Sequence, residues 1–214
     1  YSMFGFQRIG DLAWAAGDMQ ARGFLLGGTA GRTTLAGEGL QHQDGHSHLL
    51  ASTIPNCVSY DPTFGYELAV IIQNGMERMF QNQENIFYYI TVMNENYNHP
   101  KMPEGIEKEI LAGMYLFQEA EEASIQLMGS GTILREVIDA AKTLDEDYGI
   151  VANVWSVTSF NELRKNGLDT ARWNLLNPSA PKKQTFVEEQ LAKHNGPCIA
   201  ATDYMKTYAD QIRE

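Results

Sequence analysis

The aromatic and β-branched residues that run from Ile86 to Met93 limit the folds open to this 214-residue chain more than any other stretch. Such residues favour an extended, pleated backbone, so the run predicts a β-strand. Helical patterns separate many of the strand-like runs, which predicts parallel sheets covered by helices, an α/β fold. The other expected strands lie at residues 24–28, 54–60, 125–128, 150–157 and 197–201.

The expected helices are marked by apolar residues at helical spacing and by residues that begin or end helices. One pattern covers residues 6–22 and is followed by Gly23, a common helix terminator. Asp61 followed by Pro62 predicts a helix start with Asp61 as the N-cap, and apolar residues continue on one face to Phe80. Two further helices are expected, over residues 133–144 and after Asp203 as N-cap.

A polar stretch with two prolines, residues 94–105, is the best candidate for a domain boundary. After it, residues 106–116 fit either a helix or a connector. The segment before the strand at 197–201 is polar and contains Trp173, and we assign no helix or strand to it. The chain opens on Tyr1 within an aromatic run and closes on Glu214 at a helix end. We therefore expect both ends to be cuts through a longer folded protein.

Composition excludes several classes of protein. The net charge is −11, with 27 acidic and 16 basic residues, whereas nucleic-acid binding needs a basic face. No apolar run approaches the ~18–20 residues of a membrane span and no secretory signal opens the chain, so the cytoplasm is expected. The two cysteines, Cys57 and Cys198, lie in apolar runs and are expected to be buried free thiols.

Residues 31–48 are unsuited to a core, since they hold four glycines, three histidines and two acids. Glycine permits turns and close approach of the backbone to a ligand, and His, Glu and Asp can transfer protons. The stretch therefore indicates a functional loop. It could bind a metal, contact a substrate or simply hold hydrogen-bonded histidines, and the spacing matches no fixed zinc motif. The candidate metal ligands are His42, Asp44, His46 and His48.

Two other patterns each allow two interpretations. Residues 129–132 (Gly-Ser-Gly-Thr) resemble a phosphate-binding turn, but they lack a Rossmann or P-loop motif, which favours a plain strand-to-helix turn. The aromatic residues Tyr1, Phe4 and Phe6 favour either core packing or stacking on a flat heterocycle. Residues and spacing alone stop at an α/β enzyme fragment with a glycine- and histidine-rich loop.

Nine stretches closely resemble the homodimeric bacterial pyruvate dehydrogenase family, in order and along the whole chain. They lie at residues 1–10, 31–34, 37–42, 44–48, 53–56, 94–97, 102–105, 156–160 and 201–205. The resemblance implies a thiamine-diphosphate-binding, transketolase-like α/β fold that is incomplete at both ends. It places the later part of the pyrimidine-binding domain at residues 1–102 and most of the transketolase-like C-terminal domain at residues 103–214.

The same resemblance implies oxidative decarboxylation of pyruvate, with transfer of the acetyl group to the lipoyl domain of dihydrolipoamide acetyltransferase. The implied cofactors are thiamine diphosphate and Mg²⁺, with the metal ligands upstream of this chain, and the implied assembly is a homodimer. The isolated fragment is expected to be inactive. Alternatives are another transketolase-fold thiamine-diphosphate enzyme and a non-catalytic dimerisation or scaffold piece.

Residue by residue, the resemblance implies that Phe4 stacks on the aminopyrimidine ring of the cofactor. It implies that Tyr1 and His42 are catalytic and reach the pyruvate-derived group, where a proton donor is needed. Arg8 resembles a residue among the acids that link two active centres. Four loop residues receive only a shared expectation of orienting their neighbours: Glu38, Asp44, His46 and His48.

Overall fold

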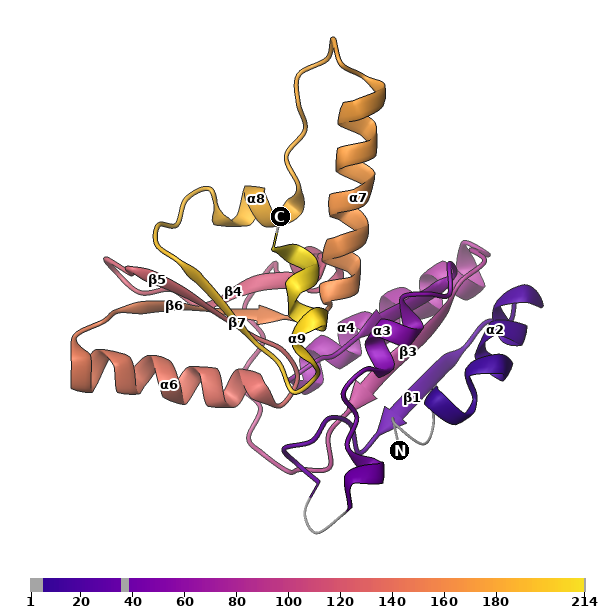
Figure 1. Ribbon diagram of the computed structural model, residues 1–214, viewed down its shortest axis with the longest axis horizontal. Coiled ribbons are helices and arrows are strands. Elements are labelled where there is room, and N and C mark those ends of the chain that lie inside the picture. Colours follow the sequence, from indigo (N-terminus) through magenta and orange to yellow (C-terminus); the bar gives the residue numbers. More distant parts are fainter. Residues whose placement is uncertain (1–5, 36–38, 214) are drawn as a thin grey trace.

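The computed structural model describes residues 6–35 and 39–213, and within these ranges the strands form two sheets (Figure 1). The first sheet is parallel and has the order β1-β3-β2. The second has the order β4-β6-β5-β7 and is parallel except for β4, which runs antiparallel to β6. The strands are β1 (Phe24–Gly28), β2 (Cys57–Tyr60), β3 (Phe87–Val92), β4 (Met114–Gln118), β5 (Ile125–Gly129), β6 (Ala152–Val157) and β7 (Cys198–Ala201).

The strand predicted at residues 86–93 is confirmed as β3, the central strand of the first sheet. Its Tyr88 and Ile90 side chains are fully buried in one core cluster with residues of β2 and α4. The other expected strands are also confirmed, several of them shorter than predicted. The aromatic run was therefore a reliable guide to the centre of the fold.

Helices cover both sheets, and α6 packs against β5 and β6 while α3 packs beside β2 (Figure 1). The α-helices are α2 (Gly10–Asp18), α3 (Ser47–Ala51), α4 (Gly65–Met76), α5 (Glu107–Ala112), α6 (Ile133–Tyr148), α7 (Phe160–Leu176), α8 (Phe186–Leu191) and α9 (Lys206–Ala209). Shorter turns complete them: the 3₁₀ helices η1 (Leu40–His42) and η3 (Asp210–Ile212), and a π-helical turn, η2 (Glu77–Gln81), that continues α4. Within the described ranges, no helix is both long and apolar enough to cross a membrane.

Both predicted acidic N-caps were wrong. Helix α4 begins at Gly65, after Phe64, and the Asp61 side chain instead accepts a hydrogen bond from Thr91 on β3. Helix α9 begins after Met205, while the Asp203 carboxylate binds the start of the histidine loop. In each case a buried carboxylate satisfies distant donors rather than the helix that follows it in sequence.

Three further findings in the second half of the chain go beyond the sequence analysis or correct it. Residues 106–116 contain both α5 and the start of β4, and the polar segment to which no element was assigned contains the 17-residue helix α7. Ser159 caps that helix by accepting a hydrogen bond from the backbone N–H of Glu162 at 3.0 Å. Cys57 is buried, and burial raises the pKa of its thiol to about 12, but Cys198 is exposed because β7 lies at the edge of the sheet.

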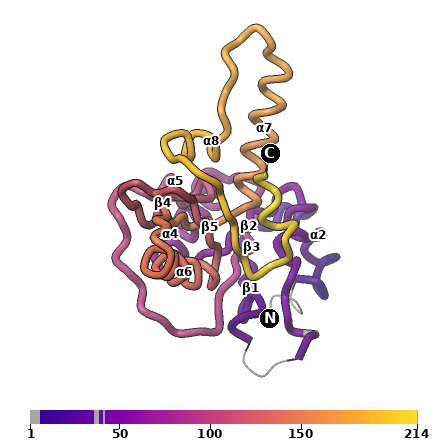
Figure 2. The backbone as a smooth tube through the Cα atoms, turned by 60° about the vertical axis from the view of Figure 1, so that its left-hand side comes forward, coloured from indigo at the N-terminus to yellow at the C-terminus, as the bar shows by residue number. Residues whose placement is uncertain are grey.

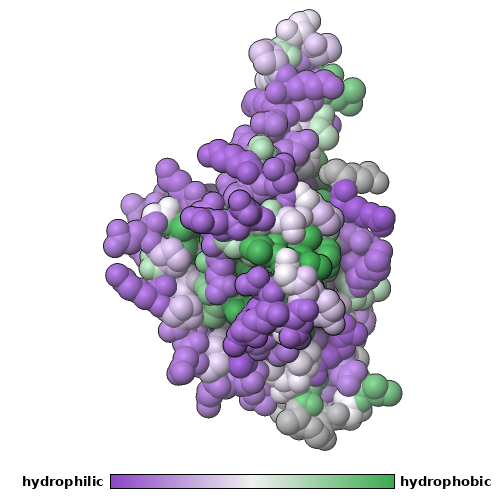
Figure 3. All heavy atoms as spheres, turned by 90° about the vertical axis from the view of Figure 1, so that its left-hand side faces the viewer, coloured by the Kyte–Doolittle hydropathy of each residue, from purple (hydrophilic) through white to green (hydrophobic). Residues whose placement is uncertain are grey.

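Helix α7 and the chain that returns from it form an arm that projects from the body (Figures 1 and 2). The returning chain is fixed to the helix, because Asn174 hydrogen-bonds both backbone groups of Lys183 at 2.9 and 3.0 Å. The Lys183 ammonium also lies 4.1 Å from the centre of the Trp173 ring. Below the arm, hydrophobic surface gathers among hydrophilic side chains (Figure 3).

The two sheets are joined where β2 and β6 end. The backbone N–H of Asp61 donates to the Thr158 carbonyl at 2.7 Å, and the Ser159 hydroxyl donates to the Ser59 carbonyl at 2.6 Å. The connector at residues 94–105 runs round the outside (Figure 2). It is anchored to α6 by Arg135, which pairs with Glu95 and stacks on a tyrosine of the connector. The exact division at residue 102 stays a prediction.

Candidate functional site

The glycine- and histidine-rich stretch forms a loop that leaves β1 and returns to α3, with η1 within it. Its base is closed by the backbone N–H of Asp44, which donates to the Gly31 carbonyl at 3.1 Å. Gly31 has φ +76°, a left-handed conformation that disfavours other residues. The predicted loop is thus a closed unit whose ends meet.

Two of the residues that the resemblance placed in the site, Tyr1 and Phe4, lie outside the described residues, as does Glu38. His42 ends η1 and is half-buried, and its backbone N–H donates to Gly39 at 3.0 Å. Arg8 is exposed. The roles of His42, Tyr1 and Phe4 remain predictions, and of these three residues the structure describes only His42.

Asp44 and His46 hold the loop in shape. One carboxylate oxygen of the fully buried Asp44 accepts the backbone N–H groups of His46 and Ser47 at 3.1 and 2.9 Å, where α3 begins. The His46 ring accepts a hydrogen bond from the Gln7 amide. These contacts agree with an orienting function for both side chains.

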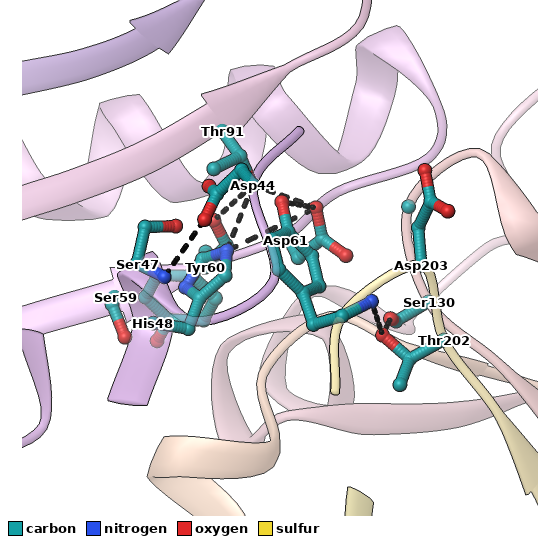
Figure 4. A network of polar contacts seen from close by, with 12 residues as sticks. Asp44, Ser47, His48, Ser59, Tyr60, Asp61, Thr91, Ser130, Thr202 and Asp203 are labelled. Carbon is teal, nitrogen blue, oxygen red and sulfur yellow. Dashed lines mark hydrogen bonds and ion pairs between the residues drawn. The ribbon is translucent and has the colours of Figure 1, made fainter. Parts of the chain in front are cut away.

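His48 points inward and not toward solvent (Figure 4). Its Nε2 lies 3.0 Å from the Thr91 hydroxyl, and its ring stacks on Tyr208 with 5.0 Å between centres. Burial lowers the pKa of His48 to about 4, although the nearby Asp44 carboxylate opposes this shift. The imidazole is therefore neutral at pH 7 and cannot serve as a cationic acid there.

Asp61 is a buried acid that the sequence assigned to a helix cap. Its Oδ1 accepts the Thr91 hydroxyl at 2.6 Å and lies 4.0 Å from Nε2 of His48 (Figure 4). Burial raises the pKa of Asp61 to about 7, and hydrogen bonds from neighbouring hydroxyl groups, Thr91 foremost, oppose the shift. The sequence could have indicated Asp61 as a candidate site residue because it follows a strand directly, and side chains in that position gather at the carboxyl edge of a parallel sheet.

Two alternatives from the sequence find no support in the geometry. Within residues 6–35 and 39–213, no three His, Cys, Asp or Glu side chains lie together as a metal site: Asp44 accepts two backbone N–H groups and His48 packs against tyrosines. The turn at 129–132 is a strand-to-helix turn whose Gly131 N–H donates to the Asp61 carbonyl at 3.1 Å. A Cβ at Gly131 would lie 2.5 Å from the Asp61 carboxylate, so that turn is closed by protein.

Comparison with known folds defines the class. Transketolase from Campylobacter jejuni superposes with a TM-score of 0.75 at 18% identity, covering 99% of this chain and 29% of that one. Transketolase from Leishmania mexicana gives a TM-score of 0.70 at 13% identity, covering 97% and 27%. The chain thus has a transketolase-like α/β fold, as predicted.

Sequence matches narrow the class to one family. Residues 1–100 match the pyruvate dehydrogenase E1 component middle domain, and residues 113–214 match the transketolase-like C-terminal domain. The whole chain is 66% identical to the pyruvate dehydrogenase E1 component of Pseudomonas aeruginosa and 56% identical to that of Escherichia coli K12. It belongs to the pyruvate dehydrogenase E1 component family and spans 25% and 24% of the length of these two relatives.

Proposed function

We propose that this chain supplies one part of the active centre of a thiamine-diphosphate-dependent pyruvate dehydrogenase. In that reaction pyruvate is decarboxylated and its acetyl group passes to the lipoyl domain of dihydrolipoamide acetyltransferase. Identity of 66% along all 217 aligned residues is the observation that carries the proposal. A homodimeric assembly and a cytoplasmic location are parts of the same proposal.

The described residues suit proton transfer rather than metal binding. The loop presents a half-buried imidazole at His42, whereas the described part of the chain offers no group of three metal-ligating side chains. The ligands of Mg²⁺ are proposed to lie upstream of this chain, and no step here depends on the metal. When bound, thiamine diphosphate supplies the carbon nucleophile and the electron sink for decarboxylation.

His42 is the residue proposed to move a proton. An imidazole can donate a proton to the keto oxygen as negative charge develops there, and can later take it back. The short helix η1 and the closed loop base fix the backbone that carries His42. Tyr1 is proposed as a second hydrogen-bond donor to the same group, and Phe4 as a stacking platform for the pyrimidine ring.

The first experiment is pyruvate-dependent dye reduction by the full-length protein, with thiamine diphosphate and Mg²⁺ added singly, together and not at all. Activity that requires both would support the proposal. Turnover of other keto acids or of ketose phosphates in place of pyruvate would keep the fold and reject the substrate. Phe4→Ala should weaken cofactor binding more than it slows the saturated enzyme, and unchanged cofactor affinity would reject the stacking role.

A further inference from the structure

The segment that follows β7 crosses from the second sheet to the histidine loop. Asp203 Oδ2 accepts the backbone N–H groups of Arg32 and Thr33 at 2.6 and 2.8 Å, and Oδ1 accepts the Thr33 hydroxyl at 2.8 Å. In return, Arg32 Nε donates to the Asp203 carbonyl at 2.7 Å and Arg32 Nη2 to the Tyr204 carbonyl at 3.1 Å. Five hydrogen bonds therefore join residues that lie 170 to 172 positions apart in the sequence.

The same segment also holds the other end of the loop. The backbone N–H of Met205 donates to the Gly45 carbonyl at 2.8 Å. Because Asp44 closes the loop base on Gly31, residues 203–205 grip both ends of the stretch that carries His42. We call residues 203–205 the strap.

The fit at the start of the loop is close. A Cβ added to Gly31 would lie 2.3 Å from Asp203 Oδ2, far inside van der Waals contact. Gly31 also has φ +76°, so both the conformation and the approach of the carboxylate require glycine. The Asp203 side chain is buried, and charged acceptors form shorter and stronger hydrogen bonds than neutral ones. The contact is thus close and specific.

We infer that Asp203 is a positioning residue, which fixes the catalytic loop through the strap and so sets the place of the His42 imidazole. This inference rests on the function proposed above. Displacement of a catalytic group by about 1 Å can lower a rate by roughly 10²-fold, so a loosened loop should show its effect in turnover. Neither the acid–base group nor the cofactor would be touched by the change.

The test uses the full-length protein with thiamine diphosphate and Mg²⁺ bound. In Asp203→Ala, deuterium exchange over residues 31–45 should accelerate and kcat should fall about 10- to 100-fold. The change in KM for pyruvate should be smaller than the change in kcat. Asp203→Asn should restore most of the protection and turnover, since its one amide oxygen can still accept both backbone N–H groups.

Three further variants test the interpretation. Asp210→Ala removes a carboxylate from the next turn, where Asp210 pairs only with exposed Lys206, and should leave exchange and kcat unchanged. If Asp203→Ala does not fold, Thr33→Val removes the single hydroxyl contact and should show a smaller effect of the same kind. Gly31→Ala strains the same contact, so its effect and that of Asp203→Ala should not add.

The outcomes of the Asp203→Ala experiment separate the positioning role from a structural one. Faster exchange with an unchanged kcat, or an equal change in kcat and KM, would overturn the positioning role and leave the strap purely structural. Unchanged exchange in Asp203→Ala would show that the strap does not hold the loop. If the wild-type protein does not turn over pyruvate, the proposed function fails, whereas the exchange comparison still measures the strap.

Discussion

The Glu67 carboxylate on α4 lies 2.7 Å from the Tyr115 hydroxyl on β4, so an acid beside the first sheet is bound by a strand of the second. Ser156 on β6 donates to the same oxygen at 2.6 Å, and the other oxygen accepts two backbone N–H groups that precede α4. Burial raises the pKa of Glu67, while these donors oppose that shift. A single buried side chain thus connects the two halves of the molecule.

Glu67→Ala should lower the free energy of unfolding by about 3–6 kcal/mol, since each of two lost side-chain hydrogen bonds to a charged group contributes about 1.5–3 kcal/mol. Denaturant titration of the full-length protein measures the change. Exposed Glu77 on the following turn gives the control, and Glu77→Ala should stay within about 0.5 kcal/mol of wild type. A loss for Glu67→Ala no larger than the control would contradict this prediction.

The titrations of Asp61 and His48 should make the free energy of unfolding change with pH in opposite directions. The pKa of Asp61 rises from 3.8 to about 7 on folding, so its stabilising effect is complete below pH 3.8 and is lost as the pH approaches 7. The pKa of His48 falls from 6.5 to about 4, so its effect is complete above pH 6.5 and is lost as the pH falls to 4.

Asp61→Asn should therefore remove the falling slope. Between pH 4 and 6.5 the stability of the variant should rise by about 3 kcal/mol relative to wild type, because one pKa unit corresponds to about 1.4 kcal/mol. Unfolding midpoints measured across this range provide the check, with Asp210→Asn as a surface control. A variant profile that parallels wild type would show that Asp61 does not titrate in this window.

His42→Ala should lower pyruvate turnover by the full-length protein by roughly 10²–10⁴, the range for general acid–base groups. His99→Ala is the matched control, because His99 is exposed on the connector and its ring contacts the backbone N–H of Gly65. Steady-state dye reduction at saturating cofactor measures both. Wild-type turnover in His42→Ala would remove it from the catalytic residues.

Arg135→Ala should loosen the connector with little effect elsewhere. Its guanidinium lies 4.4 Å from the centre of the Tyr97 ring and 2.9 Å from the Glu95 carboxylate. Contacts of this exposure contribute about 0.5–1 kcal/mol each, so stability should fall by about 1 kcal/mol. Cleavage of residues 94–105 by a protease should accelerate, whereas Lys142→Ala on the same helix should leave the cleavage rate unchanged.

Local signals predicted the strands well and the long-range contacts poorly. The aromatic run correctly predicted β3 because aromatic and β-branched side chains fit a buried, pleated strand at the centre of a sheet. Asp61 and Asp203 were mistaken for N-caps because an acid followed by a helical pattern is the usual form of a cap. Their true donors, Thr91 and Thr33, lie 30 and 170 residues away, a separation that no local pattern records.

Helix α7 was missed because its mean hydropathy is low and its apolar face is narrow. Only four of its residues are buried, and most of the helix projects as the arm (Figure 1). The candidate site was found from composition, since glycine and histidine are rarely concentrated in one loop without a use. That His48 is fully buried while His42 is half-buried required the three-dimensional structure.

The strap imposes an order on the formation of these contacts during protein synthesis. Its contact from Arg32 to Asp203 spans 171 residues, so the histidine loop leaves the ribosome long before the carboxylate that will hold it. At about 5–20 residues per second, that interval is roughly 10–30 s. During synthesis the first sheet can assemble around β3, while the loop that carries His42 gains its contacts with Asp203 only after β7 has been made. The histidine loop therefore obtains its long-range contacts later than the sheet from which it leaves.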